Sequence, residues 1–353
     1  LFRRRAKARE KVAGTLPAIS KKIAVGMSGG VDSSVALLLL KQAGWEPVGV
    51  SLRMHSFSNI SPAKSVCRKL GVPHFICDVR KDFRRCVIEF LTSELRHGRT
   101  PNPCAECNRT LKFVKLFEFA KKHKIPFVAT GHYAQSNSKG ELLRPKDLSK
   151  DQSYGLCFLS KEQLSHTIFP LGSLTKKEVL LLAKKAGVSS SITQKPSQDL
   201  CFLPKKKMQD FIKEKLGKSP GAIFDSSGKR LGFHRGLHFY TIGQRKGLSL
   251  NGLYFVKEMD HAKNRLIATK DRSEIFQSQA RLMNLHFISG KVPKKPANLL
   301  AQARYHQPPV EAVLDGKIIR FKKPIQAVTP GQVCALYTGK KCLGGGIIAG
   351  KTT

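Results

Sequence analysis

The chain of 353 residues has 63 Lys and Arg against 24 Asp and Glu, which gives a formal net charge of +39. Hydrophobic residues make up 41% and charged residues 25%, as in ordinary globular proteins, so a disordered chain is excluded. No apolar run approaches the ~20 residues that a membrane-spanning helix needs. The length predicts two or three domains. The charge favours a polyanionic partner over the alternative that the lysines are simply a solvated surface. Among polyanions, nucleic acid is favoured over acidic lipid.

The basic N-terminus and the cysteines bear on where the protein works. Residues 1–21 are rich in Arg and Lys, with Glu10 as the one acid, and have no apolar region of a secretory signal. We expect an arm that touches RNA in the cytoplasm or, alternatively, a transit peptide that leads to an organelle matrix. The nine Cys lie mostly in apolar segments, which is typical of reduced thiols in a cytosolic enzyme and not of a secreted disulfide framework.

From residue 22 the sequence alternates predicted strands and helices. Strands are expected at residues 23–27, 48–53, 74–79 and 126–130, and helices at 33–42, 62–70, 83–96 and 111–123. Repeated βα units predict an α/β domain with a doubly wound parallel sheet and helices on both faces. Ligands of such sheets bind at the carboxyl ends of the strands.

Beyond residue 201 the pattern changes. A helix is expected over 205–216, and then short strands separated by turn signals at 225–228, 251–252, 315–316, 330–331 and 344–346. Alternation in 310–314 and 317–321 is typical of an antiparallel sheet or small barrel. The predicted organisation is an N-terminal arm (1–21), a catalytic α/β domain (22–205), a central domain (206–277) and a C-terminal antiparallel β-barrel (278–353).

The strongest local signal is the segment Ser-Gly-Gly-Val-Asp-Ser-Ser at 28–34, between the first strand and the first helix. Its glycines allow a sharp turn that brings backbone N–H groups and a helix N-terminus against an anion. Ser28, Ser33 and Ser34 would offer hydroxyls to phosphate, and Asp32 would cap the helix or engage Mg²⁺. The Lys of a Walker A loop is missing, which disfavours γ-phosphate transfer. The segment resembles the loop of the ATP pyrophosphatase superfamily, whose members cleave ATP between the α and β phosphates.

Three of the nine cysteines are candidates for a catalytic or metal-binding role. Cys104 and Cys107 are expected in a Pro-broken loop before a predicted helix, and Cys201 follows 94 residues after Cys107. A thiol at a helix N-terminus has its pKa lowered by the helix dipole, and Lys112 and Arg109 would lower it further. Such a thiolate can attack sulfur, carry a persulfide or bind metal. The alternatives are buried thiols without a chemical role, or a zinc site, which would require a second Cys-x-x-Cys pair.

Taken together, these features resemble the tRNA-specific 2-thiouridylase family over about residues 22–346. The likeness lies in separate blocks at residues 26–33, 98–108, 129–133, 150–154, 169–172, 201–202, 241–248, 303–305, 327–332 and 342–346. The resemblance implies an adenine nucleotide α-hydrolase-like catalytic domain that binds ATP, a small central domain that binds tRNA, and a C-terminal β-barrel.

The resemblance also implies roles for individual residues. ATP, with Mg²⁺ as the accompanying metal ion, would be bound by Gly26, Met27, Ser28, Gly29, Gly30, Val31, Asp32, Ser33, Met54 and Gly131, all of these being ATP-binding positions. The target uracil would meet Asn102, Pro103 and Cys104. The anticodon arm of tRNA would contact His132, Lys150, Asp151, Gln152, Arg304, Tyr305 and Gln332. Cys107 would be the nucleophile, and Cys201 would carry a persulfide received from an upstream sulfur-carrier protein.

The implied reaction is 2-thiolation of the wobble uridine (position 34 of the tRNA). ATP adenylates uracil O2, and sulfur then replaces that oxygen, giving 2-thiouridine, AMP and pyrophosphate. Two thiols suit the transfer, because one delivers the persulfide sulfur and the other releases it. This chain departs from most relatives at Cys104, where they carry Asp. Cys104, Cys107 and Cys201 would alternatively ligate a [4Fe–4S] cluster with one open iron.

Two rival functions differ in testable features of the sequence. Another tRNA-thiolating ATP pyrophosphatase, acting at a different uridine or cytidine, would lack the blocks at 241–248 and 304–305, which are present. A degenerate RNA-binding module without catalysis would have no need of Asp32, Cys107 and Cys201, all of which remain.

Overall fold

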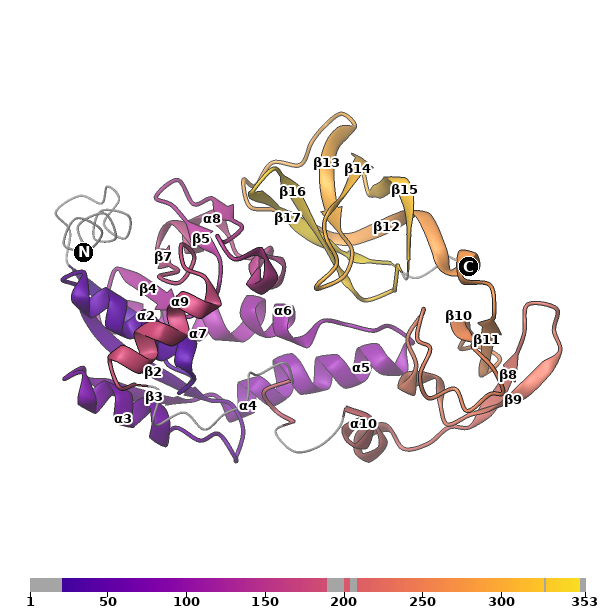
Figure 1. The fold of residues 1–353 in the computed structure, drawn as a ribbon, viewed down its shortest axis with the longest axis horizontal. Helices are drawn as coiled ribbons and strands as arrows, with labels where there is room; N and C mark the ends of the chain where they lie inside the picture. The colour runs from indigo at the N-terminus through magenta and orange to yellow at the C-terminus, as the bar shows by residue number, and fades with distance from the viewer. Residues whose placement is uncertain (1–20, 189–199, 204–207, 327, 350–353) are drawn as a thin grey trace.

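The computed structural model describes residues 21–188, 200–203, 208–326 and 328–349. A parallel sheet with its helices stands at one end of the long axis, a small second sheet at the other, and a β-barrel above the helices that join them (Figure 1). The parallel sheet has the strand order β3-β2-β1-β4-β7. Its strands are β1 (Lys22–Gly26), β2 (Glu46–Arg53), β3 (His74–Asp78), β4 (Phe127–Thr130) and β7 (Thr167–Ile168).

Helices cover both faces of this sheet and bury its apolar side chains. One face carries α2 (Val31–Gln42), α3 (Ser61–Lys69) and α9 (Lys176–Lys185). On the other face α7 (Phe113–Lys122) packs Leu116 and Phe119 against Val128. Removing these side chains from water is the main force that holds the layers together. The predicted doubly wound α/β fold is confirmed.

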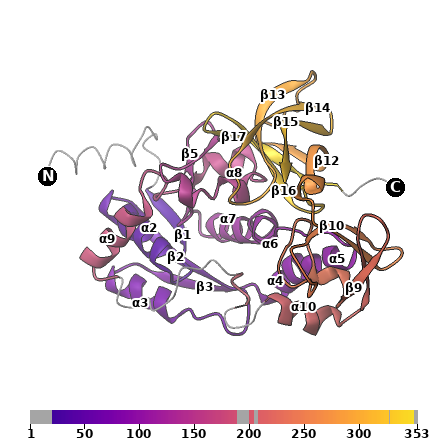
Figure 2. The same cartoon turned by 45° about the vertical axis from the view of Figure 1, so that its right-hand side comes forward.

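Two long helices run from the sheet toward the second sheet (Figure 2). The first is α4 (Arg80–Phe83), η1 (Arg84–Glu89) and α5 (Phe90–Arg96), and the second is α6 (Pro103–Cys107), η2 (Asn108–Lys112) and α7. Each contains one π-helical turn, η1 or η2, a feature that is frequent at functional sites.

The second long helix starts eight residues earlier than the sequence predicted, at Pro103 instead of 111. Asn102 caps it, because its side-chain oxygen accepts the N–H of Ala105 at 3.0 Å, and Pro suits the first helical position. The prediction of a loop around the cysteines was therefore wrong. Cys104 and Cys107 lie in the first turns of a helix.

The small central sheet has the order β10-β11-β8-β9. Its strands are β8 (Gly221–Phe224), β9 (Arg230–His234), β10 (Phe255–Asp260) and β11 (Arg265–Thr269), and α10 (Met208–Leu216) precedes them. Ile223 and Leu266 share one apolar core with Leu91 of α5, so the helix pair fixes this sheet to the catalytic part. The predicted helix over 205–216 is confirmed from Met208, and residues 205–207 lie outside the described ranges.

The C-terminal β-barrel is closed by pairing between its first and last strands. The strands are β12 (Phe276–Phe287), β13 (Ala297–Gln302), β14 (Val310–Asp315), β15 (Ile318–Gln326), β16 (Val333–Thr338) and β17 (Lys341–Ile348). Two short strands of the catalytic part, β5 (Gln135–Ser136) and β6 (Leu142–Leu143), extend the sheet beyond β17. The expected antiparallel barrel is confirmed.

The turn predicted at residues 344–346 was wrong, because these glycines lie inside β17. A Cβ on Gly345 would come 2.8 Å from Cys157 Sγ and 2.9 Å from the Cys334 carbonyl oxygen. Glycine is required there by close packing of the barrel on the catalytic part and not by a turn.

Short elements complete the fold: η3 (Leu148–Lys150), η4 (Ser153–Leu156), α8 (Lys161–Ser165), η5 (Leu237–Phe239) and η6 (Arg272–Ile275). No helix in the part of the chain that the structure describes is long and apolar enough to cross a bilayer.

Candidate active site

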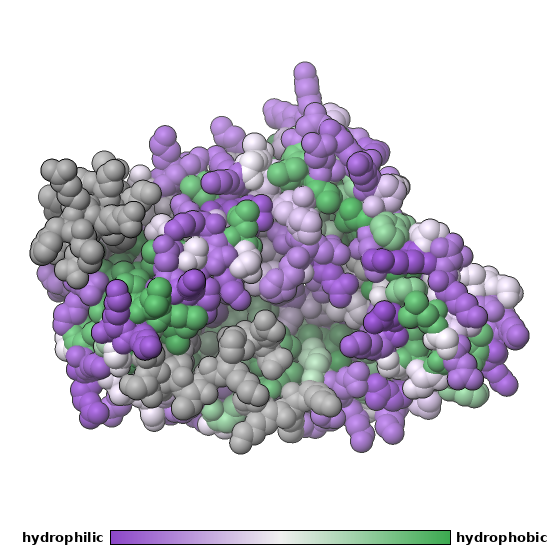
Figure 3. Space-filling view, in the orientation of Figure 1, coloured by the Kyte–Doolittle hydropathy of each residue, from purple (hydrophilic) through white to green (hydrophobic). Residues whose placement is uncertain are grey.

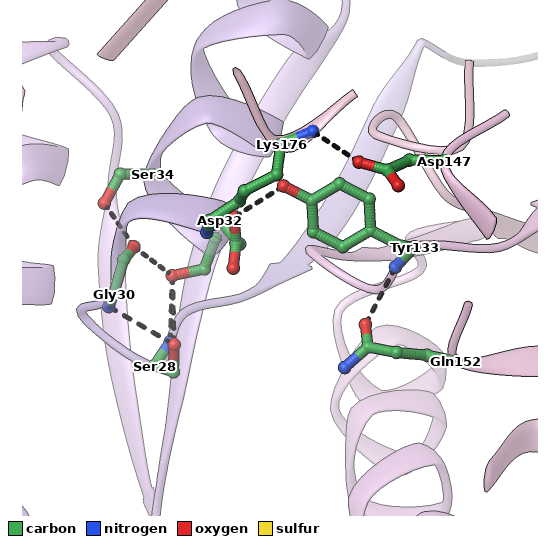
Figure 4. Close-up of polar contacts among 9 residues, drawn as sticks. Ser28, Gly30, Asp32, Ser34, Tyr133, Asp147, Gln152 and Lys176 are labelled. Atoms are coloured by element: carbon green, nitrogen blue, oxygen red, sulfur yellow. Dashed lines mark hydrogen bonds and ion pairs between the residues drawn. The ribbon is translucent and has the colours of Figure 1, made fainter. Parts of the chain in front are cut away.

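The loop between β1 and α2 is shaped by its own hydroxyl groups (Figure 4). Ser33 Oγ and Ser34 Oγ both donate to the Gly30 carbonyl oxygen, at 3.0 and 2.9 Å. Gly29 has a φ of +81°, which glycine adopts without strain. Ser28 Oγ lies 3.2 Å from Ser33 Oγ and accepts the Gly30 N–H at 3.3 Å. The prediction for Ser34 was wrong, because its side chain is fully buried and cannot reach a phosphate.

Asp32 is the acidic side chain of this loop, and two groups from elsewhere hold it. Lys176 Nζ lies 2.7 Å from Asp32 Oδ1, and the Tyr133 hydroxyl donates to the same oxygen at 2.9 Å. Burial and the Asp32 charge raise the pKa of Tyr133, so its hydroxyl stays a donor. Gly30, not Asp32, is the N-cap of α2. The capping role predicted for Asp32 was wrong.

Further contacts place Lys176 and Tyr133 around the loop (Figure 4). The backbone N–H of Lys176 donates to Asp147 Oδ2 at 2.9 Å, and that of Tyr133 donates to Gln152 Oε1 at 2.8 Å. Lys176 is the first residue of α9 and supplies the cation that the loop itself lacks. Sequence reasoning missed it, because the only local signal was the Thr175 capping box, which marks a helix start and not a function.

Gly131 follows β4 and presses against the backbone of the loop. A Cβ there would lie 2.7 Å from both the Asp32 carbonyl carbon and the Ser33 nitrogen, so only glycine fits. Met27 is buried under the loop, and Met54 comes directly after β2 at the same edge of the sheet. The structure thus brings the predicted ATP-binding residues together at the carboxyl ends of β1, β2 and β4.

Cys107 lies on the inner side of its helix. It is buried in one apolar cluster with Val87, Leu111 and Phe202. Burial raises the pKa of Cys107 to about 12, although the Lys112 charge opposes the rise. The expectation of a lowered pKa was therefore wrong, because loss of hydration outweighs one nearby cation.

Arg109, the second cation expected to assist the thiol, is engaged elsewhere. Its guanidinium pairs with Glu106 at 2.8 Å on the outer side of the same helix. Lys112 is the cation whose charge lowers the pKa of Cys107 against the effect of burial.

Cys104 and Cys201 are exposed, in contrast to Cys107. The pKa of each is still raised by the protein that surrounds it, and the Lys112 charge lowers both. The three thiols are close enough to affect one another's ionisation. The structure therefore gathers all three predicted cysteines around Lys112.

These thiols do not form a metal-ligand set. Across residues 21–188, 200–203, 208–326 and 328–349, no three His, Cys, Asp or Glu side chains are grouped so that they could hold a metal ion. All nine cysteines lie within those ranges and are free thiols. In this structure Cys104, Cys107 and Cys201 are therefore not arranged as ligands of a metal ion.

Cys201 is held by its neighbour Phe202 and by His55. The Phe202 ring packs on Phe83, with ring centroids 5.9 Å apart. His55 follows Met54 after β2, and its ring hydrogen-bonds the backbone of Cys201. Ser58 Oγ, 3.1 Å from His55 Nδ1, fixes that ring. No pattern in the sequence marks His55, because its partner is far along the chain.

The segment that leads into Cys104 joins the three parts of the molecule at Thr100. The Thr100 N–H donates to the Pro330 carbonyl at 2.7 Å, and Gln332 Nε2 donates to the Thr100 carbonyl at 2.7 Å. Thr100 Oγ1 lies 3.4 Å from Thr241 Oγ1 of the central domain. The barrel and the central domain therefore both touch the approach to the thiols.

His132 is turned inward. Its Nδ1 lies 2.7 Å from Thr130 Oγ1, and its ring stacks on Phe113 with ring centroids 6.0 Å apart. Burial lowers the pKa of His132 well below the usual value, so the imidazole is neutral at physiological pH. This environment does not favour the direct tRNA contact predicted for His132.

The remaining predicted tRNA contacts line the junction between the catalytic part and the barrel. Asp151 Oδ2 pairs with Arg144 at 2.6 Å, beside Lys150 and Gln152. Tyr305 is exposed on the barrel next to Arg304. Burial raises the pKa of Tyr305, and the charges of Cys104 and Asp151 add to the rise.

Comparison with known proteins identifies the family. The tRNA methyl transferase HUP domain matches residues 21–205, the tRNA methyl transferase PRC-barrel domain 209–270, and the aminomethyltransferase beta-barrel domain 277–348. A tRNA-specific 2-thiouridylase MnmA from Dehalococcoides mccartyi is 38% identical over 349 residues, which cover 93% of this chain and 97% of the relative. The chain belongs to the tRNA-specific 2-thiouridylase family.

Two further comparisons differ in how similar the matched protein is to this chain. The MnmA of Coxiella burnetii (strain RSA 493) is 37% identical over 353 residues, covering 92% of this chain and 97% of that protein. The solved structure of the U34-tRNA thiolase NcsA from Methanococcus maripaludis with its [4Fe-4S] cluster covers 61% of this chain and 70% of its own, at 20% identity and a TM-score of 0.40. Members of the 2-thiouridylase family are sulfurtransferases that act on tRNA, and this chain is an enzyme of that class.

Proposed function

We propose that this 2-thiouridylase thiolates C2 of the wobble uridine (position 34 of the tRNA) by adenylation of O2 and sulfur transfer from a persulfide on Cys201. The observation that carries the proposal is that Cys107 packs in one apolar cluster with Phe202, the chain neighbour of Cys201, and that the Lys112 charge acts on both thiols. His55 connects the Cys201 backbone to the strand end where ATP would bind. We propose the bacterial cytoplasm as its compartment, since the named relatives are bacterial.

The phosphate loop would serve the first step. Uracil O2 attacks the α-phosphorus of ATP, an O–P bond forms, and pyrophosphate leaves with the electrons of the broken bond. Backbone N–H groups of the loop and Lys176 would stabilise the phosphate charge. The Asp32 carboxylate and the loop hydroxyls are oxygen ligands of the kind that Mg²⁺ prefers, and the ion would neutralise the departing pyrophosphate.

Two thiols would complete the second step. The terminal sulfur of the Cys201 persulfide attacks C2 of the adenylated base, and AMP leaves with the former O2. The Cys107 thiolate then attacks Cys201 Sγ, which breaks the S–S bond and leaves both electrons on the sulfur of 2-thiouridine. The Cys107–Cys201 disulfide is reduced by a thiol reductant before the next cycle. Lys112 would favour loss of the Cys107 proton to water.

The first turn of the second long helix, α6, would receive the base. Cys104 is exposed beside the other thiols and near Tyr305, so a flipped uridine would enter between the helix and the barrel. Asn102 and Pro103 would shape this entry by fixing the helix start. Lys150, Gln152 and Arg304 would contact the anticodon arm, and an upstream sulfur-carrier protein would load Cys201.

Cysteine variants test the proposal. Thiolation of an unmodified transcript, with ATP and a persulfide donor, should be abolished in Cys107→Ser and Cys201→Ser, while tRNA binding stays within a few-fold. Cys77→Ser is the matched control, because this half-buried thiol lies on β3 outside the group around Lys112. Full activity of Cys201→Ser would remove the persulfide role.

A [4Fe–4S] cluster on Cys104, Cys107 and Cys201 is the competing chemistry for the same reaction. Iron and sulfide assays on enzyme purified without oxygen separate the two. Full thiolation by protein that holds no iron supports the persulfide route. Thiolation that depends on bound iron would overturn it, and activity of Cys104→Asp would show that Cys104 is no essential ligand.

A further inference from the structure

The central sheet has one face that is not used for packing. Ile223, Val256 and Leu266 point into the shared core. Because side chains alternate along a strand, the neighbours of these residues point to the opposite face. That face carries Phe233, which is 67% exposed and the most exposed large apolar side chain in the described part of the chain.

The strand register places two cations and two aromatic rings on this outer face. Phe233 of β9 pairs with Ala222 of β8, and Ala222 pairs with Arg265 of β11. In the next row Phe224 of β8 pairs with Arg230 of β9, where a β-bulge skips one residue and returns Arg230 to the face of Phe233. The four side chains surround the small Ala222.

The cations and the rings interact directly. The Arg230 guanidinium carbon lies 5.3 Å from the Phe233 ring centroid, and that of Arg265 lies 5.1 Å from the Phe224 centroid. Both arginines are exposed. In Figure 3 apolar side chains stand among hydrophilic ones at the end of the molecule where Figure 1 labels these strands.

We propose that Phe233 and its two flanking arginines form a stacking site for an unpaired nucleobase of the bound tRNA. The base would stack on Phe233 above Ala222, in place of the Arg230 guanidinium, and Arg230 and Arg265 would contact the adjacent phosphates. An exposed sheet face with an aromatic ring and nearby cations has the chemistry that single-stranded RNA requires. The inference rests on the proposed function, since it assigns a second contact to the same substrate.

The charge pattern favours RNA over a protein partner. The chain carries a net +39, and both long cations on this part of the face are arginines, which suit phosphate. The acidic side chains of the face, Glu258 and Asp260, lie on β10, which β11 and β8 separate from β9, and Asp260 pairs in register with Arg265. The residues next to Phe233 in the strand register carry no carboxylate, so a nucleotide can reach its ring.

Binding of an unmodified tRNA transcript to the full-length chain tests this site. Phe233→Ala should weaken affinity about five-fold or more, as expected for loss of one base stack, while Phe233→Trp stays within about two-fold of the wild type. The slope of affinity against salt should not change in Phe233→Ala and should fall by about one in Arg265→Gln, since only the arginine contacts phosphate. Leu181→Ala, which truncates a 51% exposed apolar side chain of α9, is the matched control and should bind like the wild type.

The outcomes are distinguishable. Unchanged affinity in Phe233→Ala, with normal binding by the wild type, would overturn the stacking site alone. Unchanged tRNA affinity combined with slower sulfur loading from a carrier protein would also overturn it, because the face would then be a protein contact. Failure of the wild type to bind tRNA would instead contradict the proposed function.

Discussion

The ammonium group of Lys176 lies 2.7 Å from the carboxylate of Asp32, although the two residues belong to different helices at distant points of the chain. The pair lies over the Tyr133 ring, whose centroid is 5.8 Å from Lys176 Nζ. The loop has no lysine of its own, so α9 brings a cation to the place where triphosphate would bind. When ATP arrives, the ammonium can pass from Asp32 to a phosphate oxygen while Asp32 turns to Mg²⁺.

Lys176→Met should therefore weaken the use of ATP. We expect kcat/KM for ATP to fall about ten-fold or more, because a charge-assisted hydrogen bond contributes ~1.5–3 kcal/mol. Pyrophosphate release in the presence of tRNA measures it. Lys177→Met is the matched control, since this neighbouring lysine is exposed, and it should retain activity within about two-fold. Equal losses in both variants would contradict the assignment.

Gly131→Ala should disrupt the loop between β1 and α2, against which Gly131 packs. The added methyl group would lie 2.7 Å from backbone atoms of Asp32 and Ser33, which cannot move without distorting the start of α2. ATP binding, measured by calorimetry, should drop below detection, whereas tRNA affinity should change little. Gly155→Ala serves as the control, because its new Cβ would meet Asn108 Nδ2 at an ordinary 3.6 Å. Wild-type ATP affinity in Gly131→Ala would refute the close approach.

His55 should affect sulfur transfer more than adenylation. Its ring holds the backbone of Cys201, so His55→Ala would leave the persulfide poorly placed while the phosphate loop stays intact. We expect thiolation to fall about ten-fold relative to AMP formation, and His55→Gln to recover part of the loss, because Gln retains a hydrogen-bond donor. AMP and 2-thiouridine are quantified in the same reaction. Parallel loss of both products would show that His55 acts on the whole fold and not on Cys201.

The neutral, inward-turned His132 predicts acid sensitivity. Its folded pKa lies well below the unfolded value of about 6.5, so below pH 6.5 protons bind the unfolded chain first. Above pH 6.5 the titration of His132 therefore leaves the free energy of unfolding unchanged. Below pH 6.5 it lowers that free energy by about 1.4 kcal/mol for each pH unit. Urea unfolding between pH 7.5 and 5.5 should show a shallower decline in His132→Gln than in the wild type. An identical decline in the two proteins would mean that His132 is protonated in the fold.

Much of the fold could be predicted because local patterns determine it. The strands and helices between residues 22 and 130 follow from apolar runs and turn signals, and the observed ends differ from the predicted ones mostly by one to three residues. The helix start at Pro103 was readable in principle, since Asn before Pro is a cap signal.

The rest of the site depends on tertiary contacts. Lys176, His55 and Tyr133 reach their partners across the chain, and no spacing in the sequence announces such pairs. The raised pKa of Cys107 follows from burial against Phe202, which sequence neighbours cannot reveal. Gly345 is similarly explained by Cys157 of the catalytic part, which its position in a glycine run does not suggest.

The transfer of uracil O2 to AMP is the central chemical claim. The direct measurement uses a tRNA transcript whose target uracil carries ¹⁸O at O2, with ATP and a persulfide-loaded enzyme in a single turnover, and mass spectrometry of the AMP. The account predicts one ¹⁸O in the phosphate of each AMP formed, equal in amount to the 2-thiouridine. Unlabelled AMP accompanying 2-thiouridine would contradict it.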